Sequence, residues 1–329
     1  MRTKHFLAGA LAAVTLTVIG GCAAQKIEAL EPKLELRNAA QQLADAQQAG
    51  FTLKVTGNAD DLIAAINMQA KQDKSAEAAV TAEDATVMRQ LFKSSFTIAY
   101  DKAGAGPEDD QSMIAATVDG VAGTEIRYVD GKLYAKAPVA ELATKFGASA
   151  AEVESLSGAA VGDLPGLDAF FDGKWVAVDG KEITDLASAG AGLPAQDLEQ
   201  KKVIEELTAS ATNLVEGATV TRDSADDKHL IVTSSSTKAY AEAKRFASAV
   251  DKELVREFTA PPKDRPIVLD LWIDGGKLTA AELNVLQFVD GATGRVAARL
   301  EVTTGLPIAV PEGAAKIDLA GLLGPGATD

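Results

Sequence analysis

Apolar residues recur at intervals of three and four positions in several stretches of the chain, a spacing that predicts helices with one buried face. In the first stretch these residues include Leu36, Ala40 and Leu43, and Gly50 follows as a stop signal. Thr81 and Asp84 have the spacing of a capping box at the start of another helix. Besides that one, the predicted helices cover residues 33–49, 60–68, 138–146, 201–216 and 237–258.

Alternating apolar and polar residues predict strands with one buried face. They occur at 51–57, 96–100, 267–273 and 296–302. The dipeptide Asp-Gly occurs six times, at Asp119, Asp130, Asp172, Asp179, Asp274 and Asp290. Asp-Gly suits the two positive φ angles of a type I′ turn, the tight connection between antiparallel strands. The sequence therefore predicts an α+β fold with a large curved antiparallel sheet.

The hairpin sequences around Asp130 and Asp274 look related, which indicates a weak duplication within the chain. A stretch rich in Gly and Ala places the candidate boundary between two halves near 187–200. We nevertheless expect a single domain over 33–329.

The start of the chain has the layout of a secretory signal. Arg2 and Lys4 precede an apolar run over 6–19, and small residues follow it. The run is shorter than the ~20 apolar residues that a membrane-spanning helix needs. The single cysteine of the chain, Cys22, comes directly after these small residues.

The tetrapeptide Ile19-Gly20-Gly21-Cys22 resembles the bacterial lipobox. That resemblance implies a diacylglyceryl thioether on Cys22 and cleavage before it, so that acyl chains anchor the protein on the extracytoplasmic face of the cell membrane. A chance cysteine behind an ordinary signal is the alternative. We assign 1–21 to the signal peptide and 22–32 to a short tether, whose ten residues after the cysteine reach at most ~35 Å.

Charge and cysteine content exclude several classes of function. Removal of Arg2 and Lys4 with the signal changes the formal net charge from −15 to −17. Nucleic-acid binding needs a positive surface, so no nucleic-acid partner is expected. A single cysteine allows no intramolecular disulfide, and two histidines make a zinc site improbable, so we predict no metal and no cofactor.

The sequence contains no Gly-x-Ser-x-Gly elbow, no P-loop, no His-Glu-x-x-His and no Gly-x-Gly-x-x-Gly after a strand, and we predict no catalytic residue. His229 is the one histidine outside the signal, and it follows Asp226 and Asp227 in a predicted turn, where a solvated side chain is favoured over a general base. The Ser234–Ser236 run is expected as an exposed strand end and helix start rather than as a nucleophile. Carboxylates are too numerous for a glycosidase-like pair to be ruled out by counting.

Two further groups of residues have structural and functional interpretations. Glu108, Asp109 and Asp110 could offer oxygen ligands to Ca²⁺, but the spacing of an EF-hand is missing and a solvated acidic loop is favoured. Trp175 and Trp272 lie in predicted strands, where half-buried packing is favoured over contact with a lipid or other ligand.

The order of elements gives a family resemblance. A lipobox, a helix, a strand and hairpins such as Ile126–Tyr134, followed by the stretches Leu269–Gly275 and Leu278–Leu283, resemble the actinobacterial LppX/LprG-like lipoproteins, relatives in fold of the LolA/LolB carriers. The resemblance implies a half-barrel sheet with helices packed on its concave face and an apolar cavity between them. It also implies transport of acylated lipids or glycolipids in the cell envelope. This chain is longer than typical members.

We therefore expect a non-enzymatic lipoprotein that carries a lipid or another hydrophobic ligand. A lipid site needs a concave apolar surface that the protein's own side chains do not fill, and the many small residues are one way to leave it open. Close packing of those small residues is the alternative. The rival function is an envelope module that senses or binds a protein or cell-wall partner, and the sequence names no such partner.

Overall fold

The computed structural model describes residues 32–72, 79–102, 109–160, 166–182, 206, 209–210, 212–250, 254–258, 261 and 263–317. The predicted signal peptide, the lipobox and all of the tether except Pro32 lie outside these residues. So do Glu108 and the candidate boundary near 187–200, and the prediction of one domain with a duplicated half stays a prediction.

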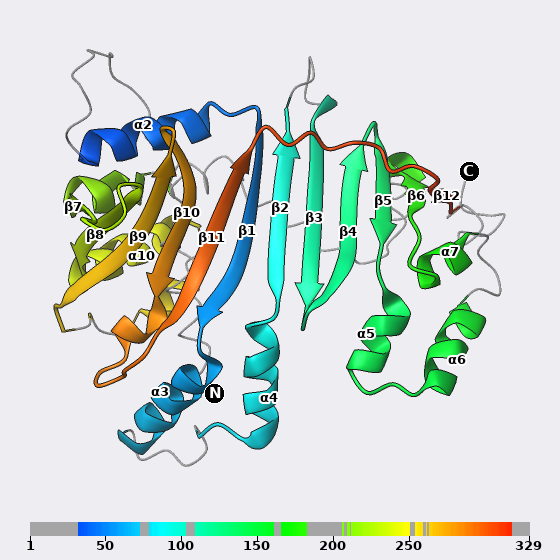
Figure 1. The fold of residues 1–329 in the computed structure, drawn as a ribbon, viewed down its shortest axis with the longest axis horizontal. Helices are drawn as coiled ribbons and strands as arrows, with labels where there is room; N and C mark the ends of the chain where they lie inside the picture. Colours follow the sequence, from blue (N-terminus) through cyan, green and yellow to red (C-terminus); the bar gives the residue numbers. More distant parts are fainter. Residues whose placement is uncertain are drawn as a thin grey trace. The chain divides into compact units, whose positions relative to one another are not determined.

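The strands of the described residues form one curved, open and mostly antiparallel sheet (Figure 1). Their order across the sheet is β12-β6-β5-β4-β3-β2-β1-β11-β10-β9-β8-β7, and β12 pairs with β6 in parallel. The strands are β1 (Gln48–Gly57), β2 (Ser95–Asp101), β3 (Gln111–Val118), β4 (Val121–Val129), β5 (Lys132–Lys136), β6 (Val176–Asp179), β7 (Thr219–Arg222), β8 (His229–Ser235), β9 (Pro266–Asp274), β10 (Lys277–Asn284), β11 (Val296–Thr304) and β12 (Ala315–Lys316). The predicted α+β class and curved antiparallel sheet are confirmed.

The α-helices are α2 (Pro32–Ala44), α3 (Ala59–Gln72), α4 (Ala82–Leu91), α5 (Val139–Lys145), α6 (Ala150–Ala160), α7 (Leu167–Phe171) and α10 (Ser236–Val250). Two short 3₁₀ helices are η3 (Leu254–Glu257) and η4 (Val285–Phe288). The chain divides into two compact units. Unit 1 contains the described residues within 1–46, 53–92 and 196–303, and unit 2 contains those within 47–52, 93–195 and 304–329.

In unit 1, α2 buries the apolar stripe that the sequence predicts. Leu36, Ala39, Ala40 and Leu43 are each at most 4% exposed, and the helix packs against β10 and β7. The helix ends at Ala44 rather than at the predicted Ala49, because Gln48 already begins β1. Gly50 is therefore a strand residue and not a helix stop.

The predicted capping box at the start of α4 is confirmed. Thr81 Oγ1 accepts a hydrogen bond from the Asp84 backbone N–H at 3.1 Å, and Asp84 Oδ2 accepts one from the Thr81 N–H at 3.0 Å. Hydrogen bonds from Thr81 hold the pKa of Asp84 below its usual value.

Beside this helix, a core of Ala65, Leu286, Val289 and Val296 joins α3 to η4 and β11.

Three of the six Asp-Gly dipeptides lie in the predicted hairpins. Asp119-Gly120 and Asp130-Gly131 form two-residue turns in which all four residues have positive φ. In the third hairpin Asp274 pairs with Lys277, so the turn is Gly275-Gly276. The hairpin prediction is wrong at Asp172, which caps α7, at Asp179, which a helical turn follows, and at Asp290, which lies between η4 and β11.

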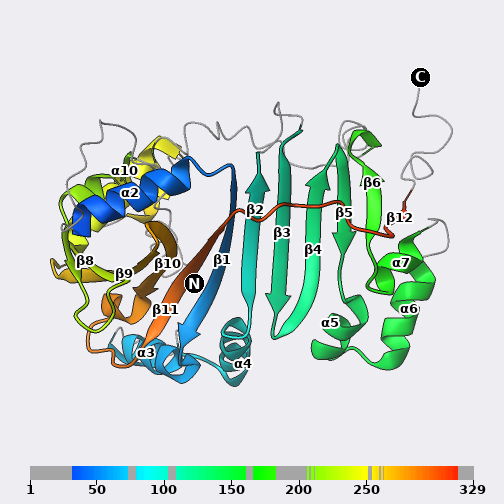
Figure 2. The ribbon, with the colours of Figure 1, turned by 45° about the horizontal axis from the view of Figure 1, so that its top comes forward.

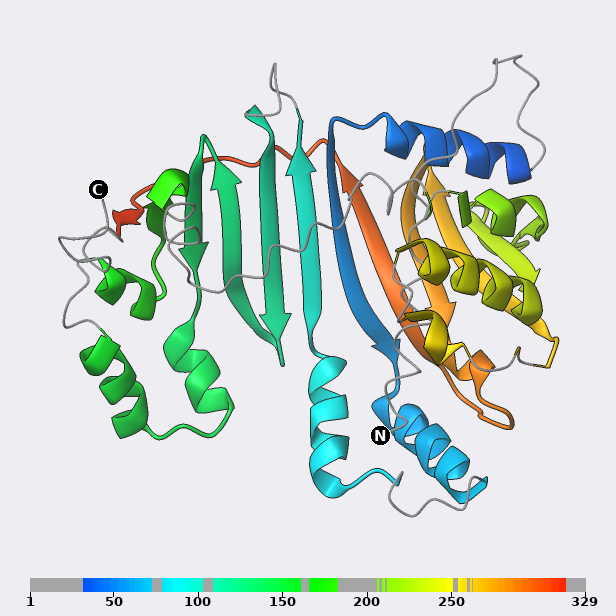
Figure 3. The ribbon, with the colours of Figure 1, turned by 180° about the vertical axis from the view of Figure 1, so that it is seen from behind.

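The predicted helix over 237–258 is shorter than its pattern. Helix α10 starts at Ser236 and ends at Val250, and η3 follows as a separate turn. The rings of Tyr240 and Phe258 still meet edge to face with centroids 5.3 Å apart, because η3 packs back on α10. Figure 3 shows α10 beside β8, which it contacts.

In unit 2, helices α5, α6 and α7 contact one another, and α7 packs on β6 (Figure 2). The predicted helix over 138–146 is confirmed as α5. Of the helix predicted over 201–216, the described residues 206, 209–210 and 212–216 are helical, and the rest lie outside the described part of the chain.

Candidate functional site

Cys22 and the three lipobox residues Ile19, Gly20 and Gly21 lie outside the described residues. Lipid attachment at Cys22 therefore stays a prediction. The candidate site that the structure adds lies in unit 2.

One face of β2, β3 and β4 carries a cluster of exposed apolar side chains. The register places Ile98 opposite Ile114 and Ile114 opposite Ile126, so that three isoleucines form a row across the strands. Phe96 and Tyr128 each lie two residues along their strand from this row, on the same face. The five side chains are 40–47% exposed. We call these five residues the apolar face.

The opposite face of the same strands is covered by the chain itself. Ala99, Val129, Tyr134 and Ile308 form a buried cluster there, and the segment after β11 crosses this face in front of β2 to β5 (Figure 1). Arg127 Nη1 donates a hydrogen bond to the Ala309 carbonyl at 2.7 Å. Figure 3 shows the other side of β2, β3 and β4, and no described helix of unit 2 lies over it.

A row of hydroxyl groups borders the apolar face at one end. Tyr100 lies opposite Ser112, and Ser112 lies opposite Tyr128. We call these three residues the hydroxyl row. Each of them lies two residues, about 7 Å, along its strand from the isoleucine row. Burial raises the pKa of the Tyr100 phenol above its usual value. Lys102 Nζ lies 5.3 Å from the centre of the Tyr100 ring.

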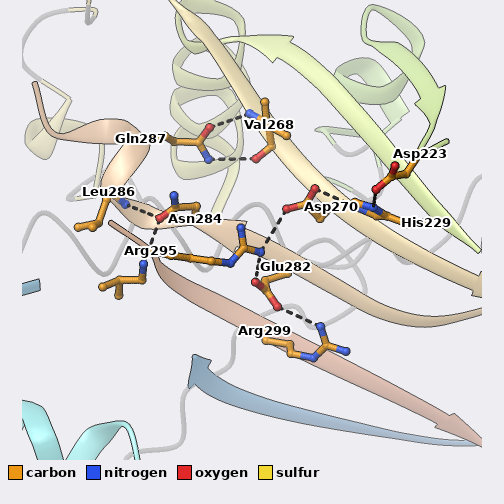
Figure 4. Close-up of polar contacts among 11 residues, drawn as sticks. Asp223, His229, Val268, Asp270, Glu282, Asn284, Leu286, Gln287, Arg295 and Arg299 are labelled. Atoms are coloured by element: carbon orange, nitrogen blue, oxygen red, sulfur yellow. Dashed lines mark hydrogen bonds and ion pairs between the residues drawn. The ribbon is translucent and has the colours of Figure 1, made fainter. Parts of the chain in front are cut away.

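Unit 1 contains a polar network around His229 (Figure 4). His229 Nδ1 lies 3.0 Å from an Asp223 oxygen, and Nε2 lies 3.0 Å from an Asp270 oxygen. Burial lowers the pKa of His229, but the hydrogen bonds and charges of the two carboxylates outweigh it and raise the pKa above its usual value. The prediction of a solvated turn residue is wrong, because His229 begins β8 and its side chain is only 14% exposed.

The network continues through alternating charges on β9, β10 and β11. Glu282 has a side chain only 7% exposed and contacts Arg295 and Arg299, the latter at 3.0 Å. Arg295 also approaches Asp270 at 3.5 Å. Each buried carboxylate contacts a cation, and both imidazole nitrogens face carboxylates. Because the charges compensate one another, we interpret the network as structural. We find no substrate-facing base in it.

The remaining candidate residues have structural partners. Trp272 lies in β9 and is half-buried, as predicted, under the guanidinium of Arg299 at 4.7 Å. Trp175 is half-buried, as predicted, but it lies directly before β6 and not in a strand. The Arg127 guanidinium and Lys136 Nζ lie 5.0 and 4.6 Å from its ring centre.

The serine run connects β8 to α10, as predicted, but the predicted exposure is wrong, because Ser234 and Ser235 are half-buried and Ser236 is buried. The Ser235 hydroxyl donates to Asp264 at 2.5 Å, and Ser236 is 4% exposed and bonded to the backbone of Lys263 and Arg265. These hydroxyls therefore fix the start of the helix.

Among the described residues, no group of three or more His, Cys, Asp or Glu side chains is placed to hold a metal ion. Asp109 is exposed and Asp110 is half-buried, and both lie just before β3. No described helix combines the length and apolar character needed to span a bilayer.

The fold is of the α+β class with a curved, open antiparallel sheet, and comparison with known proteins adds little to that description. No protein-family model matches the chain, and no curated protein matches it. Among solved structures it is similar to the crystal structure of the Mycobacterium tuberculosis lipoprotein LppX, with 11% identity and a TM-score of 0.31 over 85% of this chain and 98% of that one.

Sequence reasoning missed the apolar face, although the signal was present. The alternation of Phe96, Ile98 and Tyr100 predicts a strand that buries these residues. In the structure the other side of the strand, with Ala99, is buried, and Phe96 and Ile98 are 42% and 47% exposed. Periodicity identifies the two faces of a strand, but it does not tell which face the rest of the chain covers.

Proposed function

We propose that the protein is a lipoprotein of the cell envelope, held on the extracytoplasmic face of the membrane by acyl chains on Cys22, whose apolar face binds the hydrocarbon of a lipid or another hydrophobic ligand. The observation that carries the proposal is the contiguous exposure of Phe96, Ile98, Ile114, Ile126 and Tyr128. Monomeric proteins rarely expose such patches except at interaction or ligand sites.

The energetics require a ligand that covers most of the apolar face. Complete burial of a large apolar side chain contributes roughly 1.5–3 kcal/mol, so covering the exposed part of each of these residues contributes about 1 kcal/mol. Five residues together supply about 5 kcal/mol, and association consumes part of it. A long hydrocarbon chain meets this requirement better than a small molecule does.

The proposal involves no catalytic step. A covalent anchor and a short tether keep Pro32, where the described structure begins, within ~35 Å of the membrane surface from which a lipid would come. Binding and release of the ligand are the whole of the proposed activity.

The test compares bound lipid in two variants with matched chemistry. A soluble form that starts at residue 23 is exported in a bacterial host, purified without detergent and extracted for mass spectrometry. Ile114→Asn places an amide in the isoleucine row, whereas Leu306→Asn makes the same change at a residue 50% exposed outside the apolar face. We expect co-purified lipid in the parent and in Leu306→Asn, and at least a fivefold loss in Ile114→Asn.

Absence of lipid from the parent protein, or equal amounts in all three forms, would contradict the proposal. Retention of a protein partner that Ile114→Asn releases would favour the envelope interaction module instead.

A further inference from the structure

The apolar face has a direction, because its polarity changes along the strands. The hydroxyl row lies at one end, the isoleucine row in the middle, and Phe96, Ala116 and Thr124 form the third row. The rows follow one another at about 7 Å, so the first and the third are about 14 Å apart.

The two ends offer different chemistry to a ligand. At the first end Ser112 is exposed and Tyr128 is 40% exposed, so hydroxyl groups are presented on the surface. At the other end Phe96 is 42% exposed, while the Thr124 hydroxyl is buried and is not presented. Hydrogen-bonding capacity is therefore concentrated at the end that carries Tyr100 and Lys102.

Charges of both signs accompany the hydroxyl row. Lys102 directly follows Asp101, the last residue of β2, and Asp110 directly precedes Gln111, the partner of Asp101. Both residues therefore lie at the end of the strand pair that carries the hydroxyl row. An ammonium, a carboxylate and the exposed hydroxyls of Ser112 and Tyr128 are complementary to a headgroup that contains both a phosphate and an amine.

We infer that the ligand is a zwitterionic phospholipid-type amphiphile that lies along the strands, with its headgroup at the hydroxyl row and its acyl chain over the isoleucine row toward Phe96. This inference rests on the proposed function, since it assigns an orientation and a headgroup class to a ligand of the same face. Tyr100, Ser112 and Tyr128 are then the residues that determine headgroup preference.

The test maps the ligand's orientation by photo-crosslinking to the full-length acylated protein in phosphatidylethanolamine vesicles. One probe is a phosphatidylethanolamine with a diazirine beside the acyl carbonyl, and a second carries it at the chain terminus. We expect the carbonyl probe to label residues of the hydroxyl row and its neighbours, and the terminal probe to label the row of Phe96 and Ala116. A third arm with phosphatidylglycerol tests the headgroup class.

The double variant Ser112→Ala/Tyr128→Phe removes two hydroxyls without adding volume. Because one hydrogen bond contributes roughly 0.5–1.5 kcal/mol, we expect capture of the phosphatidylethanolamine probe to fall about fivefold or more. Capture of a diazirine-bearing alkane without a headgroup should be unchanged. The matched control Ser155→Ala/Tyr240→Phe makes the same two changes away from the apolar face and should leave both probes unaffected.

The outcomes separate the two proposals. Labelling of the apolar face with the ends reversed, or at equal frequency for both probes, overturns the orientation and leaves the proposed function standing. Equal capture of phosphatidylglycerol overturns the zwitterionic headgroup class. Absence of any label on the apolar face overturns the proposed function itself.

Discussion

The imidazole of His229 lies parallel to the indole of Trp272, with ring centroids 4.7 Å apart and planes 8° from parallel. The two residues are cross-strand neighbours on β8 and β9, and the register places them directly opposite each other. The indole covers one side of the imidazole, while Asp223 and Asp270 face its two nitrogens. His229 thus joins β8 and β9, and its contacts favour the protonated form of the imidazole.

Replacement of His229 should therefore change the pH dependence of stability. Its pKa is higher in the folded than in the unfolded protein, so its contribution is fully present below the unfolded value of about 6.5 and is lost as the pH rises through the folded pKa. We expect His229→Gln to lower the free energy of unfolding by about 1 kcal/mol at pH 5.5, since Asp223 is partly open to solvent, and by less at pH 9.

Urea unfolding of both proteins at the two pH values measures this difference. Equal destabilisation at pH 5.5 and pH 9 would contradict a charged His229, and would mean that packing on Trp272 alone accounts for the loss.

Glu282 should contribute more to stability than a surface carboxylate of the same sheet. Its side chain is 7% exposed between Arg295 and Arg299, whereas Glu301 is 38% exposed and pairs with Lys54 at 2.7 Å. Glu282→Gln removes the charge that compensates both guanidinium groups, and we expect a loss of about 2 kcal/mol. Glu301→Gln, the matched control, should cost no more than about 1 kcal/mol. Thermal or urea unfolding compares the two; similar losses would show that the burial of Glu282 does not matter.

Two glycines with positive φ should respond differently to alanine. At Gly57 (φ 99°) a Cβ atom would lie 2.0 Å from the Arg295 carbonyl oxygen, whereas at Gly120 (φ 84°) no atom lies within 4 Å of it. Gly120→Ala should cost roughly 1–2 kcal/mol for the left-handed backbone alone. Gly57→Ala adds a clash with main chain and should cost several kcal/mol or prevent folding. Yields and unfolding curves of the two variants check this order.

Cys22→Ala tests the proposed anchor. Without a thiol no thioether can form, so we expect an uncleaved or mislocalised precursor without diacylglycerol. Intact-mass analysis and membrane fractionation of the full-length protein measure this. Normal retention in the membrane with a lipid-sized mass increment would show that the attachment lies elsewhere.

Short sequence motifs predicted the elements that depend only on neighbouring residues. The capping box of Thr81 and the Asp119-Gly120 and Asp130-Gly131 turns follow from the residues themselves, and the structure contains all three. The same dipeptide at Asp172 ends a helix instead. Asp-Gly allows a positive φ, and whether strands flank it depends on more distant residues.

Tertiary context decided what local rules could not. The sequence predicts a solvated His229 because the residue lies in a predicted turn, but Asp270, which is 41 positions away, lies beside it. The apolar face shows the same limit, since its exposure depends on which side of β2 to β4 the segment around Ile308 crosses. The spacing of hydrophobic residues in a single sequence shows neither the contact of Asp270 with His229 nor the side of the sheet that the segment around Ile308 crosses.

The segment around Ile308 also determines when unit 2 can finish folding. Ile308 belongs to the buried cluster with Ala99, Val129 and Tyr134, residues synthesised long before it. Until the chain beyond residue 303 has emerged, both sides of β2 to β4 remain open to solvent, and the sheet is exposed to wrong pairing and aggregation. Closure of this face is therefore a late folding step that depends on contacts between residues far apart in the sequence.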